Sequence, residues 1–191
     1  MSSSRKNRAK TPEHSLKERW LSWYARQAPV LHFGLKFGLL VALLYIVLSF
    51  SFFDNALYTY LEANAWLANA ILHGLGQHTQ VSEVTIQSPQ FNMAIRRGCD
   101  AVEPTWLLCA AMISFPSPIL HKLRGMLVAI VLLQILNLVR IVTLYWIGIH
   151  LPAFFNSAHV ELWPTAFIGV AILIFLVWKE YSQRLPTHVS H

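Results

Sequence analysis

The residue with the clearest chemical potential is Cys99, in the stretch Arg-Arg-Gly-Cys-Asp-Ala-Val-Glu-Pro that covers residues 96–104. A polar, strand-like segment meets an apolar run here. Unpaired N–H groups and the positive end of the dipole at a helix start favour a thiolate, and Arg96 and Arg97 add positive charge. Because the thiolate is the nucleophilic form, Cys99 is the predicted nucleophile. It could instead be a small buried residue that precedes a helix.

Arg140 is the second informative residue, because it lies inside the apolar run 123–150. An arginine within a membrane span costs at least about 2.5–3.5 kcal/mol on insertion scales, so it normally faces a protein interior or an aqueous cavity. Gln134, Asn137 and Arg140 recur every three residues and therefore share one side of a helix. The pattern predicts a polar stripe turned inward. Alternatively, Arg140 snorkels outward or pairs with a buried acid such as Glu103.

His159 is the third residue, just before the last apolar run. A loop histidine is usually a solvated side chain, but with Cys99 and Arg140 it completes a set. A thiol, an imidazole and a guanidinium supply the nucleophile, proton shuttle and oxyanion stabiliser of acyl transfer. Arg140 lies about 15 Å from His150 at helical rise. The helix must therefore end early, near Gly148, or the cleft must reach into the bilayer.

The composition indicates a membrane protein. Of the 191 residues, 55% are hydrophobic and 13% are charged, whereas soluble domains usually have about 25% charged residues. The mean hydropathy is +0.45, and the apolar residues form runs long enough for membrane spans. We expect an all-α polytopic membrane protein with four to five transmembrane helices in a single helical domain.

The distribution of lysine and arginine favours four spans over five. Residues 56–75 are apolar in content but carry several polar residues, so they could span the membrane or lie along its outer surface. If they do not span, the outer segments 54–99 and 150–161 hold only Arg96 and Arg97 as basic residues, and both termini are cytoplasmic, as the positive-inside rule requires. The four expected spans are residues 34–53, 99–115, 123–150 and 161–178.

The flanks and one insertion complete the expected organisation. Residues 1–33 form a basic cytoplasmic arm, in which residues 14–27 could be an interfacial amphipathic helix. Residues 34–178 form the transmembrane domain, and residues 179–191 form a cytoplasmic tail. Residues 81–95 alternate in part between apolar and polar side chains around Ser-Pro-Gln, which predicts a β-hairpin-like insertion on the outer face.

Neither a disulfide nor a metal site is expected. On one helix, Cys99 and Cys109 would be about 15 Å apart along the axis, whereas a disulfide requires Cα atoms within about 7 Å. Neither cysteine belongs to a zinc-like C-x-x-C pair. The basic arm beside a membrane span marks the cytoplasmic side more simply than it indicates a nucleic-acid partner. No nucleic acid is therefore expected as a partner.

These residues resemble the exosortase/archaeosortase family. Gly98-Cys99 opens a span, Asn-Leu-Val-Arg at residues 137–140 lies deep in the next, and His159 leads into the last. Two short motifs are most similar to the exosortase H subtype: Cys-Asp-Ala-Val-Glu-Pro, which begins at Cys99, and His-Val-Glu-Leu-Trp, which begins at His159. The resemblance covers roughly residues 35–178. Many members have glycine where this chain has Ala101.

The resemblance implies a cysteine transpeptidase-like protease in the bacterial inner membrane, with its active site on the periplasmic side. Its substrates would be secreted proteins with a C-terminal tripartite sorting signal: a short motif, a transmembrane helix and a basic end. Cys99 would form a thioester, Arg140 would hold the oxyanion, and His159 would move the proton. No metal or cofactor is implied, and either an amine or water could resolve the thioester. Residues that could bind or orient the substrate are Asn137, Glu103 and Glu161.

Two other functions remain open. A small transporter or channel could use the stripe of Gln134, Asn137 and Arg140 as an anion path. Against this stand the few spans and the absence of paired broken helices. A structural subunit of an envelope assembly could use the strand-like segment as a docking surface. The oligomeric state is not predicted.

Overall fold

The structure of the chain, a computed structural model, describes residues 16–184. The first part of the expected basic arm and most of the expected tail lie outside the described residues. The long helices are α1 (Leu16–Leu48), α2 (Ser51–Gly74), α3 (Val102–Ser114), α4 (Ile119–His150) and α6 (Trp163–Arg184). Between α4 and α6 lie the short elements η1 (Pro152–Phe154), α5 (Phe155–Ser157) and η2 (Ala158–Leu162).

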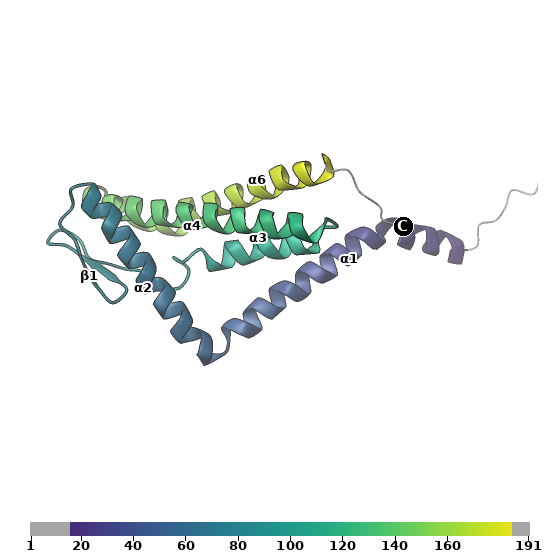
Figure 1. The fold of residues 1–191 in the computed structure, drawn as a ribbon, viewed down its shortest axis with the longest axis horizontal. Helices are drawn as coiled ribbons and strands as arrows, with labels where there is room; N and C mark the ends of the chain where they lie inside the picture. Colours follow the sequence, from purple (N-terminus) through teal and green to yellow (C-terminus); the bar gives the residue numbers. More distant parts are fainter. Residues whose placement is uncertain (1–15, 185–191) are drawn as a thin grey trace, which may run out of the picture.

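Helix α1 joins two elements that the sequence suggested were separate. It continues through the expected interfacial helix and the first expected span, with Pro29 inside it. It ends at Leu48, five residues before the expected end of that span. The Ser49 hydroxyl donates to the Tyr45 carbonyl oxygen at 2.7 Å, and Phe50 is extended (φ −88°, ψ 128°). A serine that bonds its own helix backbone competes with helix propagation, and the chain turns sharply into α2 (Figure 1).

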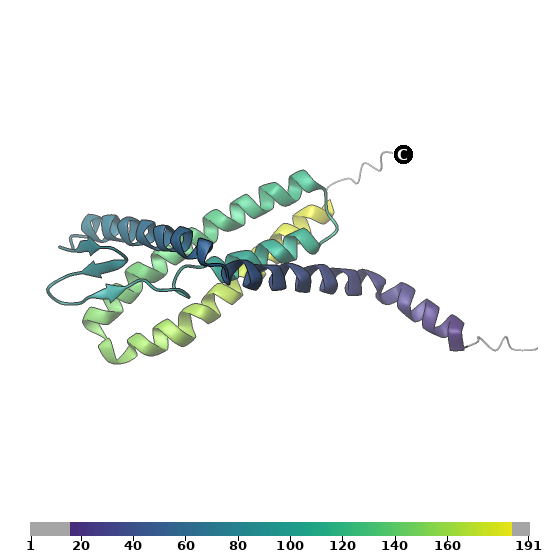
Figure 2. The same ribbon diagram turned by 90° about the horizontal axis from the view of Figure 1, so that it is seen from below.

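The helices α3, α4 and α6 run side by side and form the body of the molecule (Figures 1 and 2). Their shared core contains Leu108 and Met112 of α3, Leu133 of α4, and Phe167 and Trp178 of α6. Helix α1 leans against α3, where the Trp106 indole N–H donates to the Leu40 carbonyl oxygen at 3.0 Å. The rest of α1 presents apolar side chains outward, as expected for a surface that faces lipid.

The expected polytopic helical membrane fold is confirmed. Three stretches are long and apolar enough to cross a membrane: Arg26–Leu48, Ile119–His150 and Pro152–Arg184. The shorter apolar helix α3 lies among them. Among the described residues, α2 is not one of these candidate spans. The four-span prediction counts these same stretches together with α3, and its premise that α2 does not cross the membrane stays a prediction.

The polar insertion is a small antiparallel sheet of three strands rather than one hairpin. Its strands are β1 (Gln80–Ser82), β2 (Thr85–Gln87) and β3 (Met93–Ala94), in the order β1-β2-β3. The turn expected around Ser88 to Gln90 lies between β2 and β3. A second, tight turn between β1 and β2 was not expected from the sequence. It places Glu83 at φ +55°, without the glycine or asparagine that usually marks such a turn.

The sheet packs on the far part of α4. A core cluster joins Ile86 and Met93 of the sheet, Leu72 of α2, and Leu144 and Tyr145 of α4. Helix α4 therefore does not end near Gly148. It continues to His150, and its last turns lie beside the sheet and α2 rather than beside α3 (Figure 1). We call this end of the molecule the sheet end.

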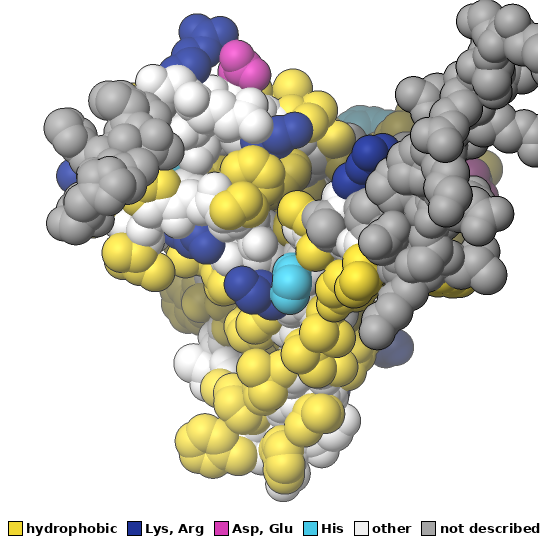
Figure 3. All heavy atoms as spheres, turned by 90° about the vertical axis from the view of Figure 1, so that its right-hand side faces the viewer, with side chains coloured by type: hydrophobic (Ala, Val, Ile, Leu, Met, Phe, Trp, Pro, Cys, Tyr) yellow, Lys and Arg dark blue, Asp and Glu magenta, His cyan; other side chains and the backbone are white. Residues whose placement is uncertain are grey.

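Basic side chains gather at the opposite end. Figure 3 views that end, with Lys and Arg side chains exposed among hydrophobic ones. Helix α4 begins there with Lys122 and Arg124, and α6 ends there with Lys179 and Arg184. Beside the start of α2, Arg97 pairs with Asp54. Arg184 pairs with Glu180, and Lys122, Arg124 and Lys179 supply the rest of the basic charge at the end opposite the sheet.

Candidate active site

Cys99 lies in a tight turn that links the sheet to α3. Its N–H donates to the Arg96 carbonyl oxygen at 2.9 Å, and Gly98 within that turn has φ +86°, a conformation that glycine adopts without steric cost. The Asp100 carboxylate then accepts a hydrogen bond at 3.0 Å from the N–H of Val102, the first residue of α3. The turn fixes Cys99 three residues before the helix begins.

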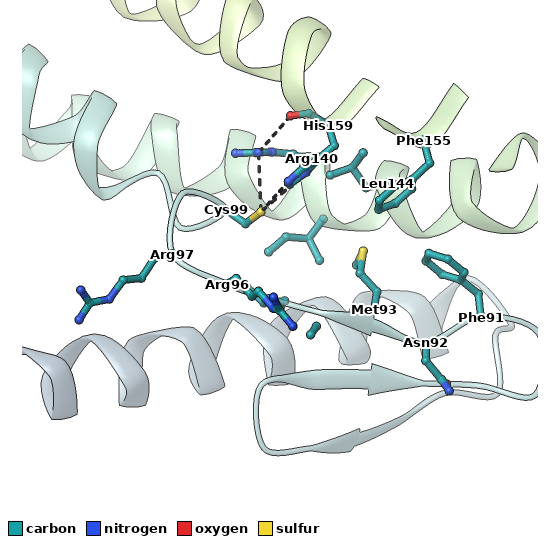
Figure 4. A pocket seen from close by; sticks show the side chains of 13 residues that line it. Phe91, Asn92, Met93, Arg96, Arg97, Cys99, Arg140, Leu144, Phe155 and His159 are labelled. Atoms are coloured by element: carbon teal, nitrogen blue, oxygen red, sulfur yellow. Dashed lines mark hydrogen bonds between the residues drawn. The ribbon is translucent and has the colours of Figure 1, made fainter. Parts of the chain in front are cut away.

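Three side chains from separate parts of the chain converge at this turn (Figure 4). The Cys99 sulfur lies 3.5 Å from Nε2 and 3.7 Å from Nδ1 of His159. Nη2 of Arg140 lies 3.8 Å from the same sulfur. The thiol, imidazole and guanidinium singled out in the sequence therefore share one site.

Arg140 is held by backbone oxygens and an aromatic ring. Its Nη1 donates to the Gly98 carbonyl oxygen at 3.1 Å, and its Nη2 donates to the His159 carbonyl oxygen at 3.5 Å. The guanidinium carbon lies 5.7 Å from the centre of the Phe167 ring. The side chain is only 4% exposed, and its buried Nε has no partner among the described residues. Because Glu103 is exposed and no described carboxylate pairs with Arg140, its positive charge remains available to the pocket.

His159 owes its position to the π-helix η2, which precedes α6. A π-turn is wider than an α-turn and occurs often at functional sites. The imidazole stacks on the Phe155 ring, with centroids 6.0 Å apart and planes 10° apart. The hydrogen bond from Arg140 Nη2 to the His159 carbonyl oxygen also holds the backbone at His159. The ring is thereby fixed on one face, with its nitrogens toward the sulfur.

The surroundings of Cys99 differ from the expectation of a ready thiolate. Burial raises the pKa of the Cys99 thiol, and this effect outweighs the attraction of the Arg140 charge, which lowers it. Arg97 does not add its charge to the thiol, because it pairs with Asp54 of α2. The thiol therefore keeps its proton near neutral pH, and the nearby His159 is placed to remove it.

The rest of the polar stripe on α4 forms a buried hydrogen-bond network. The Gln134 amide donates to the Asn64 side-chain oxygen at 2.7 Å, and the Asn137 amide donates to the same atom at 3.1 Å. The Tyr60 hydroxyl shares its proton between Gln134 Oε1 and the Asp100 carbonyl oxygen. This network links α2, α4 and the residue after Cys99, and Asn137 itself is fully buried.

A groove of about 500 Å³ opens beside the three side chains. Its near end is polar and contains Cys99, Arg140 and His159. Its far end is apolar, and the Phe91 ring there packs 5.6 Å from Phe155. The full lining is Phe91, Asn92, Met93, Ala94, Ile95, Arg96, Arg97, Cys99, Arg140, Ile141, Leu144, Phe155 and His159.

Three further residues named from the sequence lie outside this groove. Glu103 and Glu161 are exposed on their helices, and neither lines it. Cys109 is half-buried within α3, and both cysteines are free. Among residues 16–184, no group of three His, Cys, Asp or Glu side chains is arranged to hold a metal ion.

Sequence reasoning missed Tyr60 and Asn64 of α2, which position the site. The two residues are four apart, so they share one helix face. This spacing was the available signal. It could not show which partner they meet, because that partner, Gln134, is at least 70 residues away in the chain.

Comparison with protein families gives one match. A family model described as transmembrane exosortase matches residues 21–179, which include Cys99, Arg140 and His159. Comparisons with curated proteins and with solved structures found no match.

Proposed function

Since the chain belongs to the transmembrane exosortase family, as the sequence resemblance indicated, we propose that it is a cysteine transpeptidase that cleaves the C-terminal sorting tail of secreted proteins. The chain is a multi-pass membrane protein of a sorting-enzyme family. The observation that carries the finer proposal is the convergence of Cys99, Arg140 and His159 on one sulfur atom.

In the first step, His159 acts as a general base. It takes the thiol proton as the Cys99 sulfur attacks the carbonyl carbon of the scissile peptide bond. The short sulfur–imidazole distance supports this transfer, and the raised thiol pKa makes a base necessary. The carbonyl oxygen gains the negative charge as the carbon–sulfur bond forms.

Arg140 is proposed to hold that oxyanion. Its Nη2 lies 3.8 Å from the sulfur, so an oxygen on the carbon bonded to sulfur comes within its reach. The buried surroundings strengthen a charge-assisted hydrogen bond, and pre-positioned donors need no reorganisation as the charge develops.

The second step releases the tail. As the tetrahedral intermediate collapses, the carbon–nitrogen bond breaks, and the leaving amine takes the proton from His159. The substrate remains on Cys99 as a thioester. An amine or water then attacks the thioester carbonyl and gives its proton to His159, which returns the proton to the sulfur. An amine acceptor makes the reaction a transfer to a surface anchor, whereas water makes it hydrolysis.

The proposed location is the bacterial inner membrane, with the site on the periplasmic side. The support is the basic charge at the end opposite the sheet, since Lys and Arg flanking spans are retained in the cytoplasm. The Cys99 turn is at the sheet end of α3. The substrate helix would lie in the same bilayer, with its basic end beside the basic end of the enzyme.

The hydrogen-bond network argues against a transporter that uses the polar stripe. Gln134 and Asn137 are bound by Asn64, and neither lines the groove. An ion path needs these groups to be open to water. Asn137 is instead proposed as a positioning residue, which acts through Asn64.

The test uses a reporter that ends in the sorting tail of a secreted protein encoded in the same genome. Co-expression with the enzyme should shorten the reporter, and Cys99→Ala should stop this. Cys109→Ala is the matched control, because that thiol lies in α3 away from the groove, and it should leave cleavage near normal. Continued tail removal by Cys99→Ala would overturn the proposed function.

A further inference from the structure

The groove has a sheet edge as one of its walls. In the strand order β1-β2-β3, strand β3 pairs with β2 on one side only. Figure 4 shows Met93 and Arg96 on the segment nearest the groove, with the other two strands beyond it. The residues of β3 and the two that follow it all line the groove. The outer edge of β3 therefore borders the space that leads to Cys99.

The register identifies which backbone groups point out of that edge. The Ile95 N–H donates to the Val84 carbonyl oxygen at 2.8 Å, and Ile86 lies opposite Met93. In an antiparallel pair, hydrogen-bonded and non-hydrogen-bonded residues alternate. Ala94, opposite Thr85, is therefore a non-hydrogen-bonded position, and its N–H and C=O point away from β2.

These outward groups are free within the described part of the chain. No hydrogen bond between described residues outside the sheet uses the backbone of Ala94. The Ala94 side chain is exposed, whereas Met93 and Ile95 on either side are buried in the core. An exposed, unpaired strand edge is a template for another extended chain.

We propose that the substrate segment upstream of the scissile bond binds as a fourth strand on the outer edge of β3. This inference rests on the proposed function. The occupant is an extended peptide, because only such a chain can satisfy the Ala94 N–H and C=O together and still reach Cys99 at the end of the same groove. Main-chain pairing of this kind supplies affinity, and alternate side chains supply specificity.

The direction of the bound peptide follows from the path of β3. That strand runs from the apolar end of the groove, at Phe91, toward Cys99. A substrate whose C-terminal part enters the bilayer also runs toward Cys99, so it lies parallel to β3. Its side chains alternate in direction. Every second one faces the apolar wall that contains Leu144 and Phe155.

The first experiment removes the outward N–H with Ala94→Pro. A proline at a non-hydrogen-bonded edge position does not disturb the ladder to β2. The matched control is Val81→Pro. Val81 lies opposite Ile86, whose backbone groups point toward β3, so the Val81 N–H points out of the opposite edge of the sheet. The readout is kcat/KM for cleavage of the tailed reporter in detergent.

We expect Ala94→Pro to lower kcat/KM about tenfold or more, the loss that corresponds to about one hydrogen bond. The Val81→Pro control should remain within about threefold of the unmodified enzyme. Equal rates for Ala94→Pro and the unmodified enzyme would overturn edge pairing and leave the Cys99 assignment intact. Cleavage by Cys99→Ala would instead overturn the proposed function, so the two failures are distinguishable.

A second measurement uses the unmodified enzyme and does not depend on the folding of a variant. Synthetic peptides with the reporter's motif carry an N-methyl group at one residue at a time. Strand pairing predicts that cleavage falls about tenfold at every second position and changes little between them. A uniform effect, or none, would overturn the proposal even if Ala94→Pro failed to fold.

Discussion

The Cys99 sulfur lies 3.5 Å from Nε2 of His159, although 60 residues separate the two in the chain. The intervening chain descends along α3, rises along the whole of α4, and returns through η1, α5 and η2. Arg140 lies on the rising helix, and its side chain bonds to the backbone on both sides of the contact, at Gly98 and His159. The guanidinium therefore ties the cysteine turn to the histidine turn.

Two substitutions of Arg140 should distinguish the effect of its positive charge on cleavage from the effect of its planar set of donors. Arg140→Lys keeps the positive charge but loses the planar set of donors, so cleavage of the tailed reporter should fall about 10²-fold or more, as when an oxyanion donor is lost. Arg140→Gln should impair cleavage as well.

The pH dependence of Cys99 alkylation distinguishes these two variants. Burial raises the thiol pKa and the Arg140 charge opposes that rise, so loss of the charge moves the pKa further upward. Arg140→Gln should shift the alkylation midpoint to higher pH, and Arg140→Lys should leave it near that of the unmodified enzyme. A midpoint that moves to lower pH in Arg140→Gln would contradict this account.

Tyr60→Phe should destabilise the junction between α2, α4 and the cysteine turn. The change removes the proton shared by Gln134 and the Asp100 carbonyl oxygen, which leaves two part-buried acceptors without this donor, at a cost of about 1–3 kcal/mol. Thermal unfolding in detergent measures the effect. Tyr58→Phe is the control, because Tyr58 is 41% exposed. Equal unfolding midpoints for both variants would show that the network adds no stability.

Ala101→Gly should be neutral or stabilising. Ala101 has φ +58°, and a left-handed backbone costs a residue with a Cβ about 1–2 kcal/mol, whereas loss of the buried methyl costs about 0.8 kcal/mol. Ala111→Gly, within the helix α3, should destabilise by about 0.5–1 kcal/mol. Comparison of the two unfolding midpoints checks the sign. A larger loss at Ala101 than at Ala111 would refute it.

The same backbone angle suits the glycine that the family resemblance leads us to expect at this position. The sequence showed Ala101 only as a departure from the family pattern. The structure shows that the position is left-handed and caps α3, so glycine is the residue without strain there. Ala101 in place of glycine therefore adds backbone strain to the turn, but it keeps the left-handed conformation that the turn requires.

The convergence of the three chemical groups could be anticipated because each breaks a local pattern. Arg140 places a charge deep inside an apolar run, and Cys99 and His159 each precede such a run. A charge inside a span must face other protein or water, which directed Arg140 inward whatever its neighbours. The positive-inside rule then placed the helix ends of Cys99 and His159 on the same side. These arguments need no knowledge of distant contacts.

The expectations that failed depend on such contacts. The thiolate was inferred from the helix start together with the charges of Arg96 and Arg97, but the Arg97 side chain pairs with Asp54, which is 43 residues earlier. The apparent depth of Arg140 followed from the assumption that α4 ends at the membrane surface. Instead, the last turns of α4 are covered by the sheet and α2. Neither arrangement is encoded in a local pattern of residue types.

The wide turn that carries His159 makes the site sensitive to chain length. An α-helical turn contains about one residue fewer than a π-turn. Deletion of Val160 would let η2 merge into a regular helix and leave the hydrophobic packing of α6 in place, but it would rotate the imidazole by about 100° relative to that helix. A chain shortened by this one residue would insert and assemble normally, yet its cysteine would face no base.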